Sequence, residues 1–264
     1  MTSFTELLYG IQSDADGHRV SAPSAWTQGR TLYGGLSAAL CLEAVARDHP
    51  DLPQLRSAQI AFIGPAGGEV TMSTTLLRRG KSSAFANSDL SVDGAVATRA
   101  LFCFGGDRPS IDHARLEPAP NLPRPSECPP VFKPDSRPNF AQNFDMRLAS
   151  GAPPASGASD AENFIWVRHD DNKAPLNMVS LLALADAAPP AAMSLFTEPV
   201  MISTMTWTVD VLAPDALSPD GWWLCRSHAE TISNGYAAQA MSIWSSDGVP
   251  VILGRQMVAV FSSR

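Results

Sequence analysis

The feature that most constrains this chain is a hairpin pattern that occurs twice, once in each half. Residues 85–102 and residues 238–256 each read as two strands around an Asp-Gly pair, a dipeptide typical of tight turns between antiparallel strands. The two aspartates, Asp93 and Asp247, lie 154 residues apart. A repeat of this size does not fit a solenoid of short units. The sequence therefore predicts two similar domains packed together, with a functional site that only one of them need contain.

The segments before each hairpin also follow a common order. An apolar stretch rich in Ala and Leu predicts a buried helix in each half, followed by strands. The helices are expected at 33–47 and 176–186, and the strands at 55–63 and 69–78 in the first half and at 204–212 and 221–230 in the second. Runs of strands after one helix favour an α+β fold over a doubly wound fold.

Prolines crowd the stretch from Gly105 to about Pro138, which predicts an extended linker rather than a helix or strand. The linker divides the chain into an N-terminal unit at 1–108, the linker itself at 109–138 and a C-terminal unit at 139–264. Two further segments, at 143–148 and 163–168, have the pattern of paired strands.

Composition excludes several classes of function. The 264 residues carry a formal net charge of −7, which argues against sequence-independent binding of nucleic acid. No long uncharged apolar run predicts a membrane span, and the first residues do not have the pattern of a signal peptide. The four cysteines form no Cys-x-x-Cys pair, so we expect reduced thiols in a cytoplasmic protein, and no metal or other cofactor.

Some familiar motifs fail. Gly80-Lys81-Ser82 lacks the earlier glycine of a phosphate-binding loop and precedes a strand pattern rather than a helix. Ser37 follows a double glycine, but no base has a defined relation to it. His169 lies beside two aspartates at an expected strand end, where a polar structural role is more common than a catalytic one.

Asp186 is the most informative ionisable residue, because it ends an apolar helix pattern. A buried carboxylate costs several kcal/mol unless it receives hydrogen bonds. The structural alternatives are that Asp186 caps the next segment or simply ends the helix in solvent. On composition alone, a structural role and a functional role for Asp186 are about equally well supported.

Polar residues on two expected strands complete the candidates. Gln256 lies among apolar residues of the last strand next to Arg255, so one of the two faces inward. Thr204 and Thr206 alternate with apolar residues and are expected on one face of their strand. Threonine is also a good strand former, so a purely structural role is the stronger alternative for both.

Taken together, these pieces resemble the double-hotdog acyl-CoA thioesterases, the type II thioesterase family. The resemblance covers nearly the whole chain, and its motifs keep the family's order. In the first half it rests on Tyr33-Gly34-Gly35 and Phe62-Ile63-Gly64-Pro65; in the second it rests on Phe144-Asp145-Met146-Arg147, Trp166-Val167-Arg168, Leu184-Ala185-Asp186, Ser203-Thr204-Met205, and the segment from Asp247 to Gln256. The implied fold is a tandem hotdog, in which each unit wraps a long helix in a curved antiparallel sheet.

The resemblance implies a catalytic group of Asp186, Thr204 and Gln256. The spacing from Asp186 to Thr204 is short for the family, so Thr206 remains a rival for the hydroxyl and a candidate for substrate binding. Gly34 and Gly35 are candidates for binding the thioester oxygen. In the first unit, Glu43 lies near the position corresponding to Asp186, and Phe102 corresponds to Gln256, which suggests one working site and one degenerate site.

The implied reaction is hydrolysis of a fatty-acyl-CoA through a positioned water, in a homodimer with four hotdog units. Two alternatives stay open. A hotdog hydratase would need a histidine acting with a carboxylate at a helix, and neither helix contains one. A non-catalytic acyl-CoA-binding protein is suggested by Thr206-Trp207, which stand where the family often has Asp-His.

Overall fold

The fold was analysed in a computed structural model that describes residues 2–111, 113 and 118–261. The first half contains α1 (Phe4–Tyr9), β1 (Gln12–Asp14), β2 (Gly17–Ala22), β3 (Thr27–Gln28), β4 (Thr31–Leu32), α2 (Gly34–Asp48), β5 (Leu55–Phe62), β6 (Gly68–Arg79), β7 (Ser83–Val92) and β8 (Ala95–Gly105). The second half contains β9 (Phe144–Gly151), β10 (Glu162–His169), α3 (Met178–Ala185), β11 (Met201–Val211), β12 (Trp223–Ser233), β13 (Tyr236–Ser245) and β14 (Pro250–Phe261). Both predicted helices and the strands predicted after them are present, whereas β1 and β2 were not predicted.

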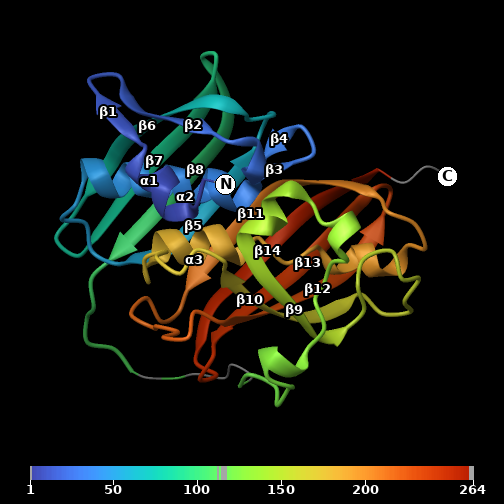
Figure 1. The fold of residues 1–264 in the computed structure, drawn as a ribbon. Helices are drawn as coiled ribbons and strands as arrows, with labels where there is room; N and C mark the ends of the chain where they lie inside the picture. The colour runs from blue at the N-terminus through green and yellow to red at the C-terminus, as the bar shows by residue number, and fades with distance from the viewer. Residues whose placement is uncertain (1, 112, 114–117, 262–264) are drawn as a thin grey trace.

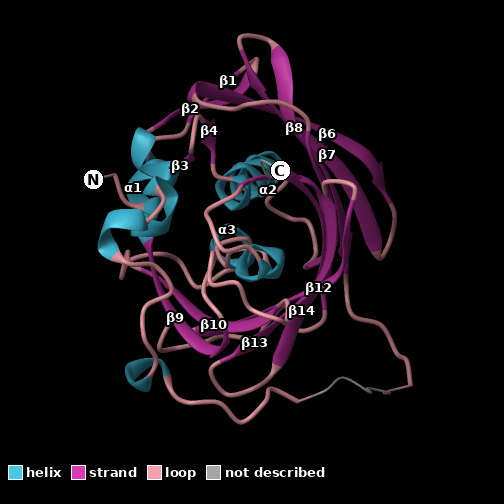
Figure 2. Cartoon of the chain, turned by 90° about the vertical axis from the view of Figure 1, so that its right-hand side faces the viewer, coloured by secondary structure: helices cyan, strands magenta, loops and turns pink. Residues whose placement is uncertain are grey.

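One large antiparallel sheet joins the two halves. Its described strands follow the order β1-β2-β6-β7-β8-β5-β11-β14-β13-β12-β10-β9, and β3 and β4 form a separate pair. β5 and β11 pair at the centre, so each half supplies one side of the sheet (Figure 1). Figure 2 shows the sheet curving around α2 and α3, which lie next to each other inside it.

Three pairing irregularities of the sheet occur in both halves. In each half, one residue is skipped at corresponding places of three ladders, which is the pattern of a β-bulge. The skipped residues are Arg56 and Met205, Leu77 and Glu230, and Ala97 and Val251. Matching bulges place Leu55 at the position of Thr204 and Phe102 at the position of Gln256.

The helices are buried for reasons visible in their sequences. Nearly every residue of α2 from Gly35 to Val45 is buried, and so are all residues of α3 from Val179 onward. The side chain of Asn177 accepts a hydrogen bond from the Ser180 N–H and caps the start of α3. The helix ends at Ala185 with Asp186 as its C-cap, shortly before Pro189 and Pro190, which cannot continue it.

The proline-rich segment is more structured than predicted. It contains 3₁₀ turns at Pro125–Glu127 and Pro134–Ser136, and another follows at Asn139–Asn143. Its backbone also bonds alongside β9, where the Val131 N–H donates to Met146 and the Leu148 N–H donates to Pro129. Among the described residues, no helix is both long and apolar enough to cross a membrane.

Candidate active site

Asp186 caps the C-terminal end of α3, with its carboxyl group largely enclosed and part of the residue reaching a cleft. Burial raises the pKa of this carboxyl group to about 7, although hydrogen bonds from Gln256 and from the backbone of Gly35 oppose the rise. A carboxyl group with such a pKa can take up and release a proton near neutral pH, which suits it to general acid–base chemistry.

Gln256 points inward from β14. The sequence predicted that either Gln256 or its neighbour Arg255 would do so. It is 5% exposed, whereas Arg255 points outward and pairs with Glu230. Its Nε2 donates to Asp186 Oδ1 at 2.6 Å. The amide is therefore a fixed donor to the carboxylate.

A second glutamine, Gln239, holds the first in this orientation. The Ala191 N–H donates to Gln239 Oε1 at 3.2 Å, and Gln239 Nε2 donates to Gln256 Oε1 at 2.7 Å. Each amide accepts a hydrogen bond at its oxygen and therefore turns its nitrogen toward the next acceptor. The last acceptor in this series is Asp186. Sequence reasoning missed Gln239. Its spacing of two and four residues from Met241 and Ile243 places all three on the same, inward face of β13.

The start of α2 lies directly against Asp186. A methyl group on Gly34 would lie 2.8 Å from Asp186 Oδ2 and 3.1 Å from the Phe62 ring, and one on Gly35 would lie 2.6 Å from the Ala183 carbonyl oxygen. Only glycine permits this approach. The first N–H groups of a helix have no partner within it, so they can serve the carboxylate and a bound oxygen.

The two candidate threonines lie on opposite faces of β11, and the prediction of a shared face is wrong. The bulge at Met205 shifts the alternation, so that Thr204 pairs with the buried Val258 and Thr206 pairs with the exposed Met257. Thr204 lines the cleft together with Asp186, while Thr206 is exposed on the outside of the sheet. Thr206 therefore contacts neither Asp186 nor the cleft.

The cleft has a volume of about 360 Å³ and draws its walls from both halves. Besides Gly34 and Asp186, it is lined by residues that include Gln28, Ser37, Thr98 and Thr204. Ser37 and Thr98 are each 2% exposed. Ser37 is thus a cleft residue, and its hydroxyl donates weakly to the Tyr33 carbonyl at 3.4 Å. Gln28 and Thr98 were not predicted, because neither belongs to a recognisable motif.

In the first half, apolar residues stand at the positions that correspond to the three candidate catalytic residues. Counted from the helix start, the residue matching Asp186 is Leu42 rather than Glu43, which instead pairs with Arg47 on the helix surface. Leu42 and Leu55 line a cleft of about 230 Å³ with the start of α3, and Phe102 is fully buried. Leucine, leucine and phenylalanine thus replace the aspartate, threonine and glutamine of the second half.

His169 has a structural environment. Its Nε2 lies 2.9 Å from the Ser180 carbonyl oxygen, and its ring packs beside Phe4 and Phe144. Burial lowers its pKa to about 4. Within the described ranges, no group of three His, Cys, Asp or Glu side chains is arranged to hold a metal ion.

Two family models match the sequence. The model of the acyl-CoA thioesterase C-terminal domain matches residues 125–260, and that of the acyl-CoA thioesterase N-terminal domain matches residues 22–105. No curated protein matches the chain.

Solved structures share the fold over the full length. A conserved protein of unknown function with a hotdog fold from Alicyclobacillus acidocaldarius is 27% identical, with a TM-score of 0.88 and 100% of both chains covered. A putative thioesterase II from Thermobifida fusca is 20% identical (TM-score 0.83), covering 99% of this chain and 98% of that one. An acyl-CoA thioesterase II from Mycobacterium marinum is 17% identical (TM-score 0.76), with 98% of each chain covered. The chain therefore has a hotdog fold.

Proposed function

Because the chain belongs to the acyl-CoA thioesterase family, we propose that it hydrolyses an acyl-CoA to a free carboxylic acid and coenzyme A. The observation that carries this proposal is the position of Asp186. Its carboxyl group has a raised pKa, a fixed amide donor and a helix start beside it, and it opens onto a cleft.

In the proposed reaction, Asp186 acts as a general base on a water molecule. The water oxygen attacks the thioester carbon while its proton passes to the carboxylate. The resulting tetrahedral intermediate then breaks its carbon–sulfur bond, and the proton held by Asp186 passes to the departing thiolate. Acid and thiol are released, and the carboxylate returns to its ionised form.

The neighbouring groups have separate tasks in this scheme. Gln256 holds the carboxylate, and Thr204 contributes a hydroxyl from the opposite wall to fix the water. At the start of α2, the Gly35 N–H serves the carboxylate, and we assign the Gly34 N–H beside it to stabilising the oxyanion that forms on the thioester oxygen. We assign no part in binding to Thr206, because its side chain lies on the other face of the sheet.

We further propose that the halves are two hotdog units, at 1–108 and 139–264, joined by a linker at 109–138. The repeated bulges support this division. One composite site results, with its helix start from the first unit and its carboxylate from the second. Assembly into a homodimer with four units, and a cytoplasmic location, remain predictions.

The alternatives have less support. A hydratase needs a histidine beside its carboxylate, and the described residues that line the cleft include none. A protein that only binds acyl-CoA would not need a raised pKa or a chain of oriented amides. Thiol release from acyl-CoA, followed with a thiol reagent and matched to free acid formed, tests the proposal. Equal amounts of both products are expected; binding without release would contradict it.

A further inference from the structure

A small, mostly apolar pocket lies beside Asp186. We infer that the preferred substrates are short-chain acyl-CoAs, with acyl groups of about two to four carbons; this inference rests on the proposed thioesterase function.

Two spaces meet at the carboxylate. Gln28, Asp186, Ile202 and Thr204 line both the cleft of about 360 Å³ and a second pocket of about 50 Å³. A thioester carbon held at Asp186 thus has one space on each side. The coenzyme A arm must occupy one, and the acyl group the other.

The residues that line each space indicate which part of the substrate it holds. The larger cleft presents the hydroxyl-bearing residues Thr31, Ser37 and Thr98, which suit the amide groups of the pantetheine arm. The residues that line only the small pocket are three prolines, two alanines, two phenylalanines and Met193. A wall without polar side chains suits a hydrocarbon group. The small pocket is therefore the acyl side.

Its size then sets the chain length. An apolar cavity of about 150 Å³ accommodates benzene, whereas a single water needs only about 10–15 Å³. The pocket of about 50 Å³ lies between these values. It has room for a few carbon atoms, and a longer alkyl chain would have to extend out of the pocket.

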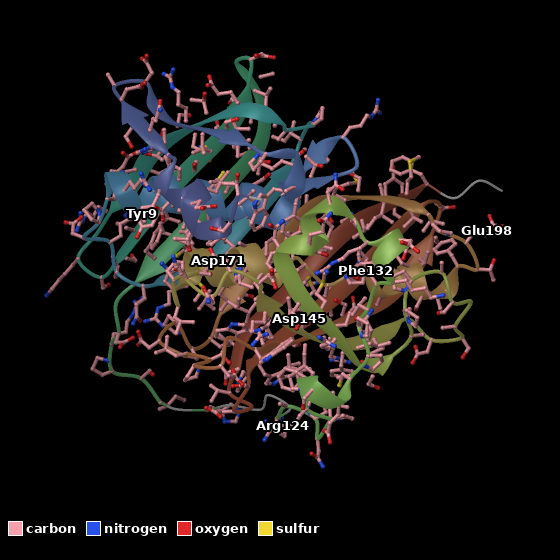
Figure 3. The ribbon with its side chains drawn as sticks, in the orientation of Figure 1. Tyr9, Arg124, Phe132, Asp145, Asp171 and Glu198 are labelled. Carbon is pink, nitrogen blue, oxygen red and sulfur yellow. The ribbon has the colours of Figure 1, made fainter. Side chains whose placement is uncertain are left out.

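Several contacts keep the walls in place. The Phe140 ring stacks on Tyr33 with centroids 4.3 Å apart, and the Tyr33 hydroxyl donates to the Ala183 carbonyl at 2.9 Å. Pro189 and Pro190 are buried and have fixed φ angles. Met193 and Phe132 also line the pocket. Phe132, which is labelled in Figure 3, comes from the segment before β9. Met193 is the flexible member.

The chain-length profile of the wild-type protein is the first test. We expect kcat/KM for acetyl- to butyryl-CoA to exceed that for octanoyl- and palmitoyl-CoA by about 10-fold or more, since a single methylene in an apolar pocket changes rates by this order. Faster hydrolysis of octanoyl-CoA or longer substrates overturns the inference but leaves the proposed function standing. If no acyl-CoA in the panel releases thiol, the proposed function itself fails.

Met193→Ala locates the acyl group. By enlarging the small pocket, it is expected to raise the ratio of hexanoyl- to acetyl-CoA hydrolysis by about 10-fold. The matched control is Met201→Ala, the same change at an exposed residue outside both spaces, and it should leave the ratio unchanged. An unchanged ratio in Met193→Ala places the acyl group elsewhere and overturns the assignment. Met193→Val, a smaller reduction, replaces it if thermal denaturation shows that Met193→Ala does not fold.

Discussion

Asp186 combines a buried carboxyl group with only a few hydrogen-bond donors. Gln256 and the Gly35 backbone lower its pKa, but burial raises it by more, to about 7. A salt-bridged aspartate would instead have a depressed pKa and be a weak base. The partners of Asp186 are neutral groups, so the carboxylate is held in position without losing its basicity.

The pH dependence of the reaction follows from this balance. A general base must be ionised, and ionisation of Asp186 is favoured only above its pKa of about 7. We therefore expect kcat/KM to rise with pH below about 7 and to level off above it. The measurement is thiol release from pH 5 to 9 with a fixed substrate, an interval chosen around that pKa. A flat profile across the interval would contradict a base with this pKa.

The bulge at Met205 places Thr204 and Thr206 on opposite faces of the strand, so we expect different effects when each is replaced. Thr204 lines the cleft and Thr206 does not, so Thr204→Ala is expected to lower kcat by about 10- to 100-fold, as loss of a positioning group does. Thr206→Ala is the matched control and should retain a wild-type kcat. Similar losses in both variants, measured at saturating substrate, would show that the hydroxyl at Thr204 has no special part.

At the scale of elements, α2 and α3 make the site by approaching each other closely. The start of α2 fits against Asp186 because residues 34 and 35 lack side chains. The Gly34–Gly35 pair could be predicted as a helix start. Its contact with a carboxylate about 150 residues later could not, because that contact depends on how the two halves pack.

Gly34→Ala tests this approach. The added methyl group would lie 2.8 Å from Asp186 Oδ2 and 3.1 Å from the Phe62 ring, so the carboxylate, the ring or the helix start must move and their fit is disturbed. We expect a loss of activity of about 100-fold and a lower free energy of unfolding by about 1–3 kcal/mol. Gly80→Ala is the control, since its methyl group meets only ordinary contacts, the nearest at 3.4 Å. Urea denaturation and thiol release measure the two effects; a fully active Gly34→Ala would contradict the account.

Hydrophobic periodicity predicted the helices and most strands. The apolar residues around Asp186 and around the pair Arg255–Gln256 marked these polar residues as candidates for the site. The same periodicity failed at Thr206, because a bulge adds a residue to one strand without changing the composition around it. Gln239 was also missed. Its role depends on a hydrogen bond to Gln256 across β13 and β14, and no pattern within one strand reveals it.

At the scale of the molecule, two similar halves produce one site. The cleft draws on both halves, and its counterpart in the first half has Leu42 and Leu55 where the site has Asp186 and Thr204. Duplication could be predicted from the two Asp-Gly hairpins. That apolar residues replace Thr204 and Gln256 in the first half becomes clear only when the bulges set the correspondence between strands.

The number of sites per chain follows from this asymmetry. A non-hydrolysable acetyl-CoA analogue, with a thioether in place of the thioester, should bind with one site per chain by titration calorimetry. The counterpart has Leu42 and Leu55 in place of Asp186 and Thr204, so it lacks the carboxylate and the hydroxyl that would hold the reacting groups. Two equivalent sites per chain would contradict a composite site formed once.

In the proposed reaction, Asp186 removes the proton from the attacking water. Asp186→Asn keeps the shape of the side chain but removes its basicity, and the thiol-release rate of this variant is the most direct measurement. With the best acyl-CoA of the panel and at pH 8, we expect a rate below about one hundredth of wild type, the order that a general base contributes. A rate above about a tenth of wild type in a correctly folded variant would contradict this role for Asp186.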